Sequence, residues 1–380
     1  PYAISSDQID EIPKRGWIPV TVPGAVKGWK ALSERFGSLP FKQLLEPAID
    51  YARNGYPVSA EIARMWKKAL NAIPNSEEFK GWYETFTFDG KTPEPGQMIC
   101  MPKLADALEK IADTNTDALY YGELADCIDE ESRKFGGFLR KQDLMDHVVE
   151  WVEPIHVDYH GYKVWELPPN GQGIVALMAL NILNNFQFDS RNADCIHTQM
   201  EALKMAFADA KEYVTDPKCM NMPVNDLISV EYGKKRANQI KHTALPPRVD
   251  KPHGSGTVYL CTADKDGNMV SYIQSNYMGF GSGIVVDGVS LQNRGYDFSL
   301  DPSHVNYLMP HKKTYHTIIP GFLTKDDKPV GPFGVMGGYM QPQGHMQVVT
   351  NMIDFHLNPQ MALDAKRFQW IENKKFIVEP

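Results

Sequence analysis

Apolar residues recur at helical spacing through the first 250 residues, between proline and glycine positions that interrupt the pattern. The spacing predicts helices with apolar stripes at 26–36, 44–51, 104–111 and 196–207. Gly55 ends the second helix, and Pro102 occupies the first position of the third, where its missing N–H is tolerated. We interpret the last stripe, in a helix at 193–213, as core rather than as a cofactor-binding face.

The pattern changes to short β-favouring runs after residue 250. The runs at 258–263 and 269–275 flank a loop that contains the pair Asp266-Gly267, which predicts a β-hairpin. Further strands are expected at 283–286, 289–292, 315–319 and 330–335, and a helix returns at 342–356. Helices, then strands, then helices indicate sheets covered by helices, which is an α+β layered architecture.

The composition is that of a globular protein and excludes two classes of partner. The 380 residues are 43% hydrophobic and 23% charged, enough for two domains or one large layered domain. The net charge of -8 is spread along the chain, and no basic run exceeds Lys234-Lys235-Arg236, so we expect no nucleic-acid partner. No apolar run approaches the ~20 residues of a membrane span, so we expect none.

Cysteine and histidine spacing predicts neither a metal nor a cofactor. The five cysteines form no CxxC pair, so we interpret them as buried reduced thiols, which favours a cytoplasmic location. The chain begins at Pro1 rather than Met, so the absence of a signal peptide carries no weight. The 11 histidines include neither HxH nor HExxH. The glycine-rich stretch Gly279–Gly283 runs into Ile-Val-Val rather than a helix, so no nucleotide site is expected.

A loose small-residue linker, His253–Gly256, runs directly into a strand headed by Thr257. If the peptide bond before Thr257 were cut, a hydroxyl and a new α-amine would lie on one residue and form a nucleophile with its own base. An α-amine titrates near ~8 and accepts a proton at neutral pH. On spacing alone, a simple turn into a strand is the commoner interpretation.

Further landmarks occur in order along nearly the whole chain. The segment 257–275 is followed by Phe280-Gly-Ser-Gly, and the other landmarks are at 21–28, 135–144, 167–169, 196–209, 336–338 and 357–362. Together they resemble the γ-glutamyltransferase branch of the N-terminal-nucleophile hydrolases. The resemblance implies a precursor that cleaves itself before Thr257, and a four-layer αββα sandwich fold. It implies that residues 1–256 are a large-subunit portion lacking its N-terminal part, and residues 257–380 a small-subunit portion lacking its C-terminal part.

The resemblance assigns catalytic roles to residues of the second half. Ser275 matches a hydroxyl residue that lies near the nucleophile's amine, so its expected role is to orient Thr257. Gly337 and Gly338 match a glycine pair whose backbone N–H groups bind the oxyanion. Glycine lets the backbone approach a tetrahedral intermediate closely. As bare sequence, a Gly-Gly pair is more often a turn.

The predicted substrate-binding residues depart from those of the transpeptidases. Asp297 matches the aspartate that binds the substrate α-amino group, but Tyr277 replaces an asparagine and His316-Thr317 replace paired serines. Arg294 replaces a glutamine. We hypothesise that Arg294, assisted by Thr317, binds a substrate carboxylate, because a guanidinium offers two parallel donors. A surface salt bridge is the alternative for Arg294.

The resemblance therefore implies an amidase that cleaves glutathione-like γ-glutamyl amides through an acyl-enzyme, with hydrolysis favoured over transfer. A related acylase acting on glutaryl-type amides or poly-γ-glutamate is the second reading. An uncleaved, inactive relative that only binds a ligand is the third. The expected partners are a small acidic amide and the two subunits of one precursor, and a homo-oligomer is compatible with the sequence.

Overall fold

The computed structural model describes residues 9–245 and 257–380. The chain divides into two compact units. Unit 1 comprises Pro1–Trp151 and Asn276–Tyr296, and unit 2 comprises Val152–Ser275 and Asp297–Pro380. Each unit therefore combines segments from both sides of Thr257, so the division into units differs from the predicted division into subunits.

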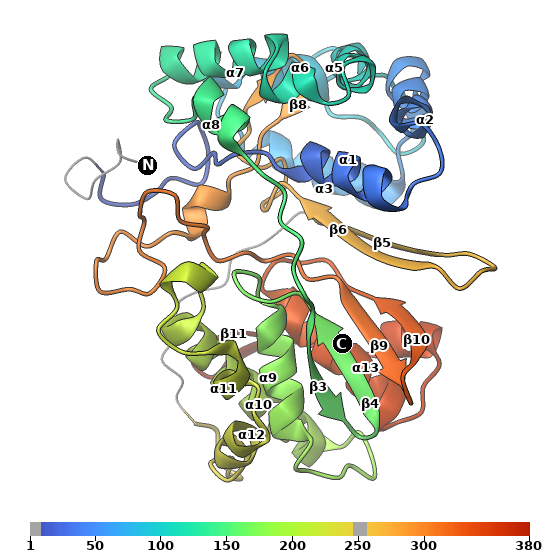
Figure 1. Ribbon diagram of the computed structural model, residues 1–380, viewed down its shortest axis with the longest axis vertical. Helices are drawn as coiled ribbons and strands as arrows, with labels where there is room; N and C mark the ends of the chain where they lie inside the picture. Colours follow the sequence, from blue (N-terminus) through green and yellow to red (C-terminus); the bar gives the residue numbers. More distant parts are fainter. Residues whose placement is uncertain (1–8, 246–256) are drawn as a thin grey trace. The chain divides into compact units, whose positions relative to one another are not determined.

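Unit 1 is mainly helical (Figure 1). Its α-helices are α1 (Ala25–Phe36), α2 (Phe41–Asn54), α3 (Ala60–Leu70), α4 (Lys80–Phe86), α5 (Pro102–Asp113), α6 (Asp117–Tyr120), α7 (Glu123–Lys134) and α8 (Lys141–Asp146). Short strand pairs are β1 (Tyr56–Pro57) with β2 (Met98–Ile99) and β7 (Val285–Val286) with β8 (Val289–Ser290). The β7–β8 segment contacts α4 and α7, and its apolar side chains join the core around Trp82 and Leu124. The segment 276–296 is thus built into the core of unit 1.

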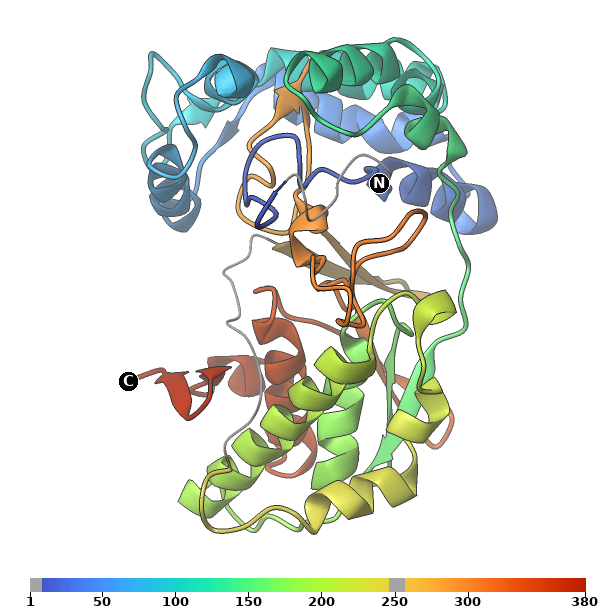
Figure 2. The ribbon, with the colours of Figure 1, turned by 90° about the vertical axis from the view of Figure 1, so that its left-hand side faces the viewer.

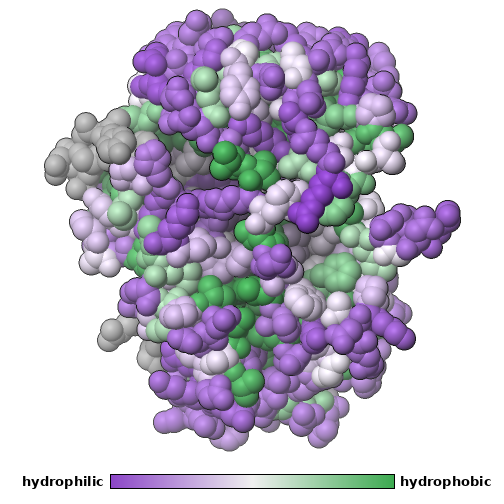
Figure 3. Space-filling model, viewed as in Figure 1, coloured by the Kyte–Doolittle hydropathy of each residue, from purple (hydrophilic) through white to green (hydrophobic). Residues whose placement is uncertain are grey.

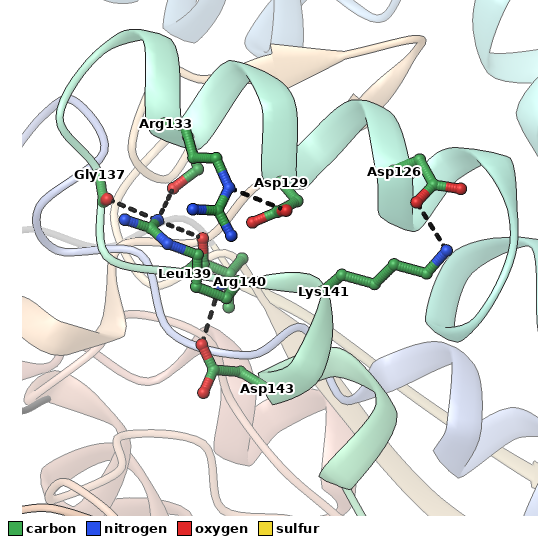
Figure 4. Close-up of polar contacts among 9 residues, drawn as sticks. Asp126, Asp129, Arg133, Gly137, Leu139, Arg140, Lys141 and Asp143 are labelled. Carbon is green, nitrogen blue, oxygen red and sulfur yellow. Dashed lines mark hydrogen bonds and ion pairs between the residues drawn. The ribbon is translucent and has the colours of Figure 1, made fainter.

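The landmark at 135–139 forms the connection between α7 and α8, and Arg140 fixes it (Figure 4). Nη1 of Arg140 donates to the carbonyl oxygens of Gly137 at 2.7 Å and Leu139 at 2.9 Å. The backbone N–H of Arg140 donates to the carboxylate of Asp143 at 2.8 Å, which satisfies a donor at the start of α8. This landmark is therefore held by one guanidinium that binds carbonyl groups of the preceding turn.

Unit 2 is built on a four-stranded antiparallel sheet with the order β10-β9-β4-β3. The strands are β3 (Ile155–Tyr159), β4 (Tyr162–Glu166), β9 (Gly321–Lys325) and β10 (Lys328–Phe333). Helix α9 (Gly173–Leu183) packs on β3 and β4, and every one of its residues is buried. Its neighbours are α10 (Ala193–Tyr213), α12 (Val230–Ala237) and α13 (Met340–Ile353), and Figure 2 shows α9 and α10 side by side. The core of unit 2 therefore surrounds α9.

The remaining elements of unit 2 are short, apart from one long hairpin. They are η2 (Pro217–Cys219), α11 (Val224–Leu227), α14 (Pro359–Asp364), β11 (Phe368–Glu372) and β12 (Lys375–Val378). The hairpin joins β5 (Thr257–Ala263) to β6 (Met269–Ser275) and lies beside β10. At its hydrophilic tip the carboxylate of Asp264 accepts the backbone N–H groups of Asp266 and Asn268, each at 2.9 Å (Figure 3). Asp264 thus closes the turn that Asp266-Gly267 predicts.

The structure confirms the predicted helices and the hairpin, and it corrects other expectations. Residues 315–319 form no strand, because the backbone N–H and C=O of His316 pair with residues 170–172 rather than with a neighbouring strand. The hairpin of β3 and β4 lies in the half that we predicted as helical; its turn uses positive φ at His160 and Gly161. β9, β11 and β12 were likewise not predicted.

Two further expectations concern cysteines and membranes. The prediction of buried thiols is wrong for Cys100, Cys219 and Cys261, which are exposed, whereas Cys195 is buried. Cys261 lies toward the tip of the long hairpin, where residues 260–263 are all exposed. Among the helices at 9–245 and 257–380, none has the length and apolar character needed to cross a membrane.

Candidate active site

The predicted nucleophile lies opposite its predicted orienting residue at the open end of the β5–β6 hairpin. Thr257 is the first residue of β5 and pairs directly with Ser275, the last residue of β6. The hydroxyl of Thr257 donates to Oγ of Ser275 at 3.0 Å, and Thr257 is only 9% exposed. The strand pairing therefore fixes the side chain of Thr257 against a second hydroxyl. The linker 253–256 that we singled out lies outside the described residues.

The glycine pair Gly337-Gly338 lies between β10 and α13 in a conformation that favours glycine. Its φ angles are 133° and 60°, and a Cβ on Gly337 would lie 3.0 Å from Cβ of Met340. The carbonyl of Gly337 accepts the N–H of Met340, and that of Gly338 accepts the N–H of Gln341, both at 3.0 Å. These bonds fix the peptide planes on both sides of Gly338 and hence the direction of its N–H. Because α13 begins directly afterwards, its N-terminal dipole also favours negative charge here.

Gln172, which sequence reasoning missed, connects the glycine pair to the predicted substrate segment. Its side chain is fully buried, and Nε2 donates to the carbonyl oxygens of Thr317 and Gly338, each at 2.7 Å. Its backbone N–H donates to the carbonyl of His316 at 2.9 Å. A signal was present in the sequence, because Gln172 is a polar residue between Gly171 and Gly173 at the head of an apolar helix.

Asp297 lies close to the same glycine segment within unit 2. The hydroxyl of Tyr339, the residue after Gly338, donates to Oδ1 of Asp297 at 3.2 Å. The ring of Tyr339 stacks on Tyr315, with the two centroids 5.9 Å apart. Burial, reinforced by the charge of Asp297, raises the pKa of Tyr315 well above its ordinary value, so this phenol stays neutral. Asp297 therefore accepts from the hydroxyl of Tyr339, whose ring stacks on the neutral phenol of Tyr315.

Arg294 and Tyr277 belong to unit 1 and contact each other there. Cζ of Arg294 lies 5.1 Å from the centroid of the Tyr277 ring, a cation–π arrangement. Arg294 is 3% exposed and Tyr277 is fully buried with φ of 75°, an unusual value for an aromatic residue. The alternative of a surface salt bridge is wrong, because the guanidinium is not at the surface. The expected cooperation of Arg294 with Thr317 stays a prediction.

A buried acid–base pair, also missed from the sequence, connects α13 to the sheet of unit 2. Nδ1 of His345 lies 2.5 Å from Oε1 of Glu166, and both side chains are fully buried. Burial raises the pKa of Glu166, and His345 partly opposes this effect. His345 lies on α13 and Glu166 ends β4, so the pair fixes the helix that follows the glycine pair against the sheet.

We expect Glu166→Gln to change the pH dependence of stability. Because burial raises the folded-state pKa of this carboxyl, its contribution is fully present below the unfolded value near ~4.3 and is lost as pH rises through the folded value. The variant should therefore gain stability relative to the wild type with rising pH, by at most ~1.4 kcal/mol per pH unit. Urea denaturation between pH 4 and 8 measures this. The exposed Glu212→Gln variant is the control. If the difference in free energy of unfolding between Glu166→Gln and the wild type does not vary with pH, as in that control, the expectation is contradicted.

Comparison with known proteins decides the family. The chain matches the family model described as Gamma-glutamyltranspeptidase over residues 2–380, nearly its whole length. The chain belongs to the γ-glutamyltranspeptidase family. This confirms the predicted enzyme class, the N-terminal-nucleophile hydrolases.

Relatives within the γ-glutamyltranspeptidase family carry different activities in their names. A cephalosporin acylase from Bacillus halodurans, known from its crystal structure, is 51% identical with a TM-score of 0.95 and covers 100% of this chain and 72% of its own. The glutathione hydrolase-like YwrD proenzyme of Bacillus subtilis is 39% identical over 94% of this chain and 69% of that protein. The oxamate amidohydrolase proenzyme of Klebsiella pneumoniae is 33% identical over 90% and 66%.

These likenesses concern the fold of the chain and the share of its relatives' length that it covers. The likeness to the acylase structure confirms that this chain has a mixed helix-and-sheet fold of the kind found in that relative. The chain spans about two thirds of the length of the curated relatives that it matches.

Proposed function

We propose that this protein is a self-cleaving amidase in which Thr257 is the nucleophile. In the first stage its hydroxyl attacks the preceding peptide carbonyl, the peptide nitrogen leaves as the α-amine of Thr257, and water hydrolyses the resulting ester. In the second stage the α-amine accepts the hydroxyl proton while Oγ attacks a substrate amide. The leaving amine takes that proton, and water then releases the acid from the acyl-enzyme.

One observation carries this proposal: the hydroxyl of Thr257, at the head of β5, donates to Oγ of Ser275 at 3.0 Å. A hydrogen bond of this kind restricts the hydroxyl to one rotamer, and a restricted nucleophile loses less conformational freedom when it attacks. Ser275 is then the residue that positions Thr257. Gly337 and Gly338 supply the N–H groups for the oxyanion, and the fixed peptide planes on both sides of Gly338 suit that role.

The proposal includes the division of the chain and its fold. Residues 1–256 belong to the large subunit and 257–380 to the small one, and the complete protein forms a four-layer αββα sandwich. The two named proenzymes among the relatives support a cleaved precursor. The cytoplasmic location and a homo-oligomer stay predictions.

The proposed substrates are γ-glutamyl amides, including glutathione-like ones, and hydrolysis is favoured over transfer. The likeness to a cephalosporin acylase favours a second candidate, an acylase for glutaryl-type amides. Poly-γ-glutamate is a further substrate of this kind. Comparison of kcat/KM for a γ-glutamyl anilide and a glutaryl anilide separates a γ-glutamyl hydrolase from a glutaryl acylase. A denaturing gel tests the third reading, an inactive relative, which predicts one band where a cleaved enzyme gives two.

We expect Arg294→Ala to lower kcat/KM for acidic acyl groups by about 10- to 100-fold, which corresponds to the loss of a charge-assisted hydrogen bond. An acetyl anilide, which lacks the acyl carboxylate, is the matched control substrate and should lose little. Arg294→Lys keeps the charge but not the two parallel donors, so it should restore only part of the activity. An unchanged kcat/KM for a glutaryl or γ-glutamyl anilide in Arg294→Ala would show that Arg294 does not bind the substrate carboxylate.

A further inference from the structure

We propose that Gln172 is a positioning residue that couples recognition of the acyl group to stabilisation of the oxyanion. The inference rests on the function proposed above and adds to it a residue that touches neither substrate nor nucleophile. One buried amide joins Thr317, in the segment proposed to hold a substrate carboxylate, to Gly338, in the segment proposed to hold the oxyanion.

The amide group of Gln172 uses both of its N–H donors on these two segments. A primary amide has two N–H bonds, and Nε2 lies 2.7 Å from the carbonyl oxygen of Thr317 and 2.7 Å from that of Gly338. The side chain is fully buried, so water cannot replace either bond without opening the core. A change in the position of either carbonyl must therefore move the amide or break a buried hydrogen bond.

The backbone around Gln172 ties the same region together. The N–H of Gln172 donates to the carbonyl of His316 at 2.9 Å, and the N–H of His316 donates to the carbonyl of Asn170 at 2.9 Å. Nδ2 of Asn170 donates to the carbonyl of Thr314 at 2.7 Å. Residues 170–172 and 314–317 are thus joined by hydrogen bonds, and the side chain of Gln172 extends this network to Gly338.

The orientation of the Gly338 carbonyl depends on its hydrogen bonds. This carbonyl accepts two donors, the N–H of Gln341 at 3.0 Å and Nε2 of Gln172 at 2.7 Å. Gly338 has φ of 60°, and glycine leaves such a backbone free to rotate unless hydrogen bonds hold it. Gln172 therefore helps to hold the peptide plane that follows Gly338, next to the plane that carries the proposed donor N–H of Gly338.

The test compares Gln172→Leu with a matched buried glutamine. Gln347 is also buried, and its Nε2 also bridges two carbonyls, those of Gln343 at 3.0 Å and Phe368 at 2.9 Å, away from the proposed oxyanion segment. Both variants are measured by urea denaturation, by a gel for chain cleavage, and by kcat and KM of the cleaved fraction with a glutaryl and a γ-glutamyl anilide. We expect both to lose stability. Gln172→Leu alone should lose about 10- to 100-fold in kcat, because small misplacement of catalytic groups costs this much.

Gln172→Glu supplies a readout that a purely structural role does not move. The protonated carboxyl can still donate one hydrogen bond, whereas the ionised form places a negative charge against two carbonyl oxygens. Burial raises the pKa of such a carboxyl. The kcat of this variant relative to the wild type should therefore rise as pH falls, and that of Gln172→Leu should not.

The outcomes separate this inference from the proposed function. An active, cleaved wild type with an unchanged kcat in Gln172→Leu overturns the inference alone. An equal loss of kcat in Gln347→Leu also overturns the inference alone. A pH profile of kcat for Gln172→Glu that is parallel to that of the wild type does the same. A wild type that remains one chain and hydrolyses neither anilide overturns the proposed function, and this inference with it.

Discussion

Thr257→Ala is expected to remain a single uncleaved chain and to lose amidase turnover by about 10⁴-fold or more, the scale on which removal of a nucleophile acts. The methyl group of alanine cannot attack the preceding carbonyl, so neither the cleavage nor the acyl-enzyme can form. Ser275 loses the hydroxyl that donates to it at 3.0 Å, but the pairing of β5 with β6 should persist. A denaturing gel and single-turnover assays with a glutaryl anilide measure both effects.

Thr262→Ala is the matched control for this variant. Thr262 lies in the same strand, is exposed, and pairs with Val270, so its substitution causes a similar loss of β propensity without removing a predicted nucleophile. It should cleave and turn over like the wild type. If Thr257→Ala keeps full turnover, another residue must be the nucleophile. If Thr262→Ala loses as much turnover as Thr257→Ala, damage to the strand explains both losses and the assignment of Thr257 loses its support.

Gly337→Ala is expected to lower kcat by about 10²- to 10³-fold, the range seen when one oxyanion donor is lost. The φ of 133° is unfavourable for a residue with a Cβ, and that Cβ would lie 3.0 Å from Cβ of Met340. The backbone must therefore rotate, and the N–H groups proposed to face the oxyanion rotate with it. KM should change less than kcat, because the interaction forms only in the transition state.

Gly331→Ala controls for backbone strain without the proposed catalytic role. Gly331 lies in β10 with φ of 151°, and no atom lies within 4 Å of an added Cβ. Strain of ~1–3 kcal/mol should lower stability in both variants, as urea denaturation will show. If both variants keep the wild-type kcat per folded molecule, Gly337 has no part in binding the oxyanion.

The parts of the fold that were predictable depend on local signals. The β5–β6 hairpin has two β-favouring runs and the turn pair Asp266-Gly267, so its register follows from a few adjacent residues. Residues 315–319 carry the same β-favouring composition, yet they form no strand. The N–H of Ile319 bonds to the side chain of Gln341, and the carbonyl of His316 bonds to Gln172. Such partners lie far away in sequence, and composition cannot reveal them.

The candidate site also has features that local sequence signals predict and features that depend on distant residues. Thr257 and Ser275 were predictable as neighbours because a single hairpin, with its turn at 264–268, connects them. The bond from Gln172 to Thr317 joins residues 145 positions apart, and the Glu166–His345 pair joins residues 179 apart. No periodicity indicates such pairs. The burial of Arg294 was also unpredictable, because it depends on how the segment 276–296 joins the helices of unit 1.

The most direct test of the account is the N-terminal sequence and intact mass of the mature wild-type protein. Cleavage before Thr257 should produce a second chain whose sequence begins Thr-Val-Tyr-Leu. The masses of the two chains should sum to that of the precursor plus one water. A single intact chain in fully active protein, or a second chain that begins at any other residue, would contradict the account.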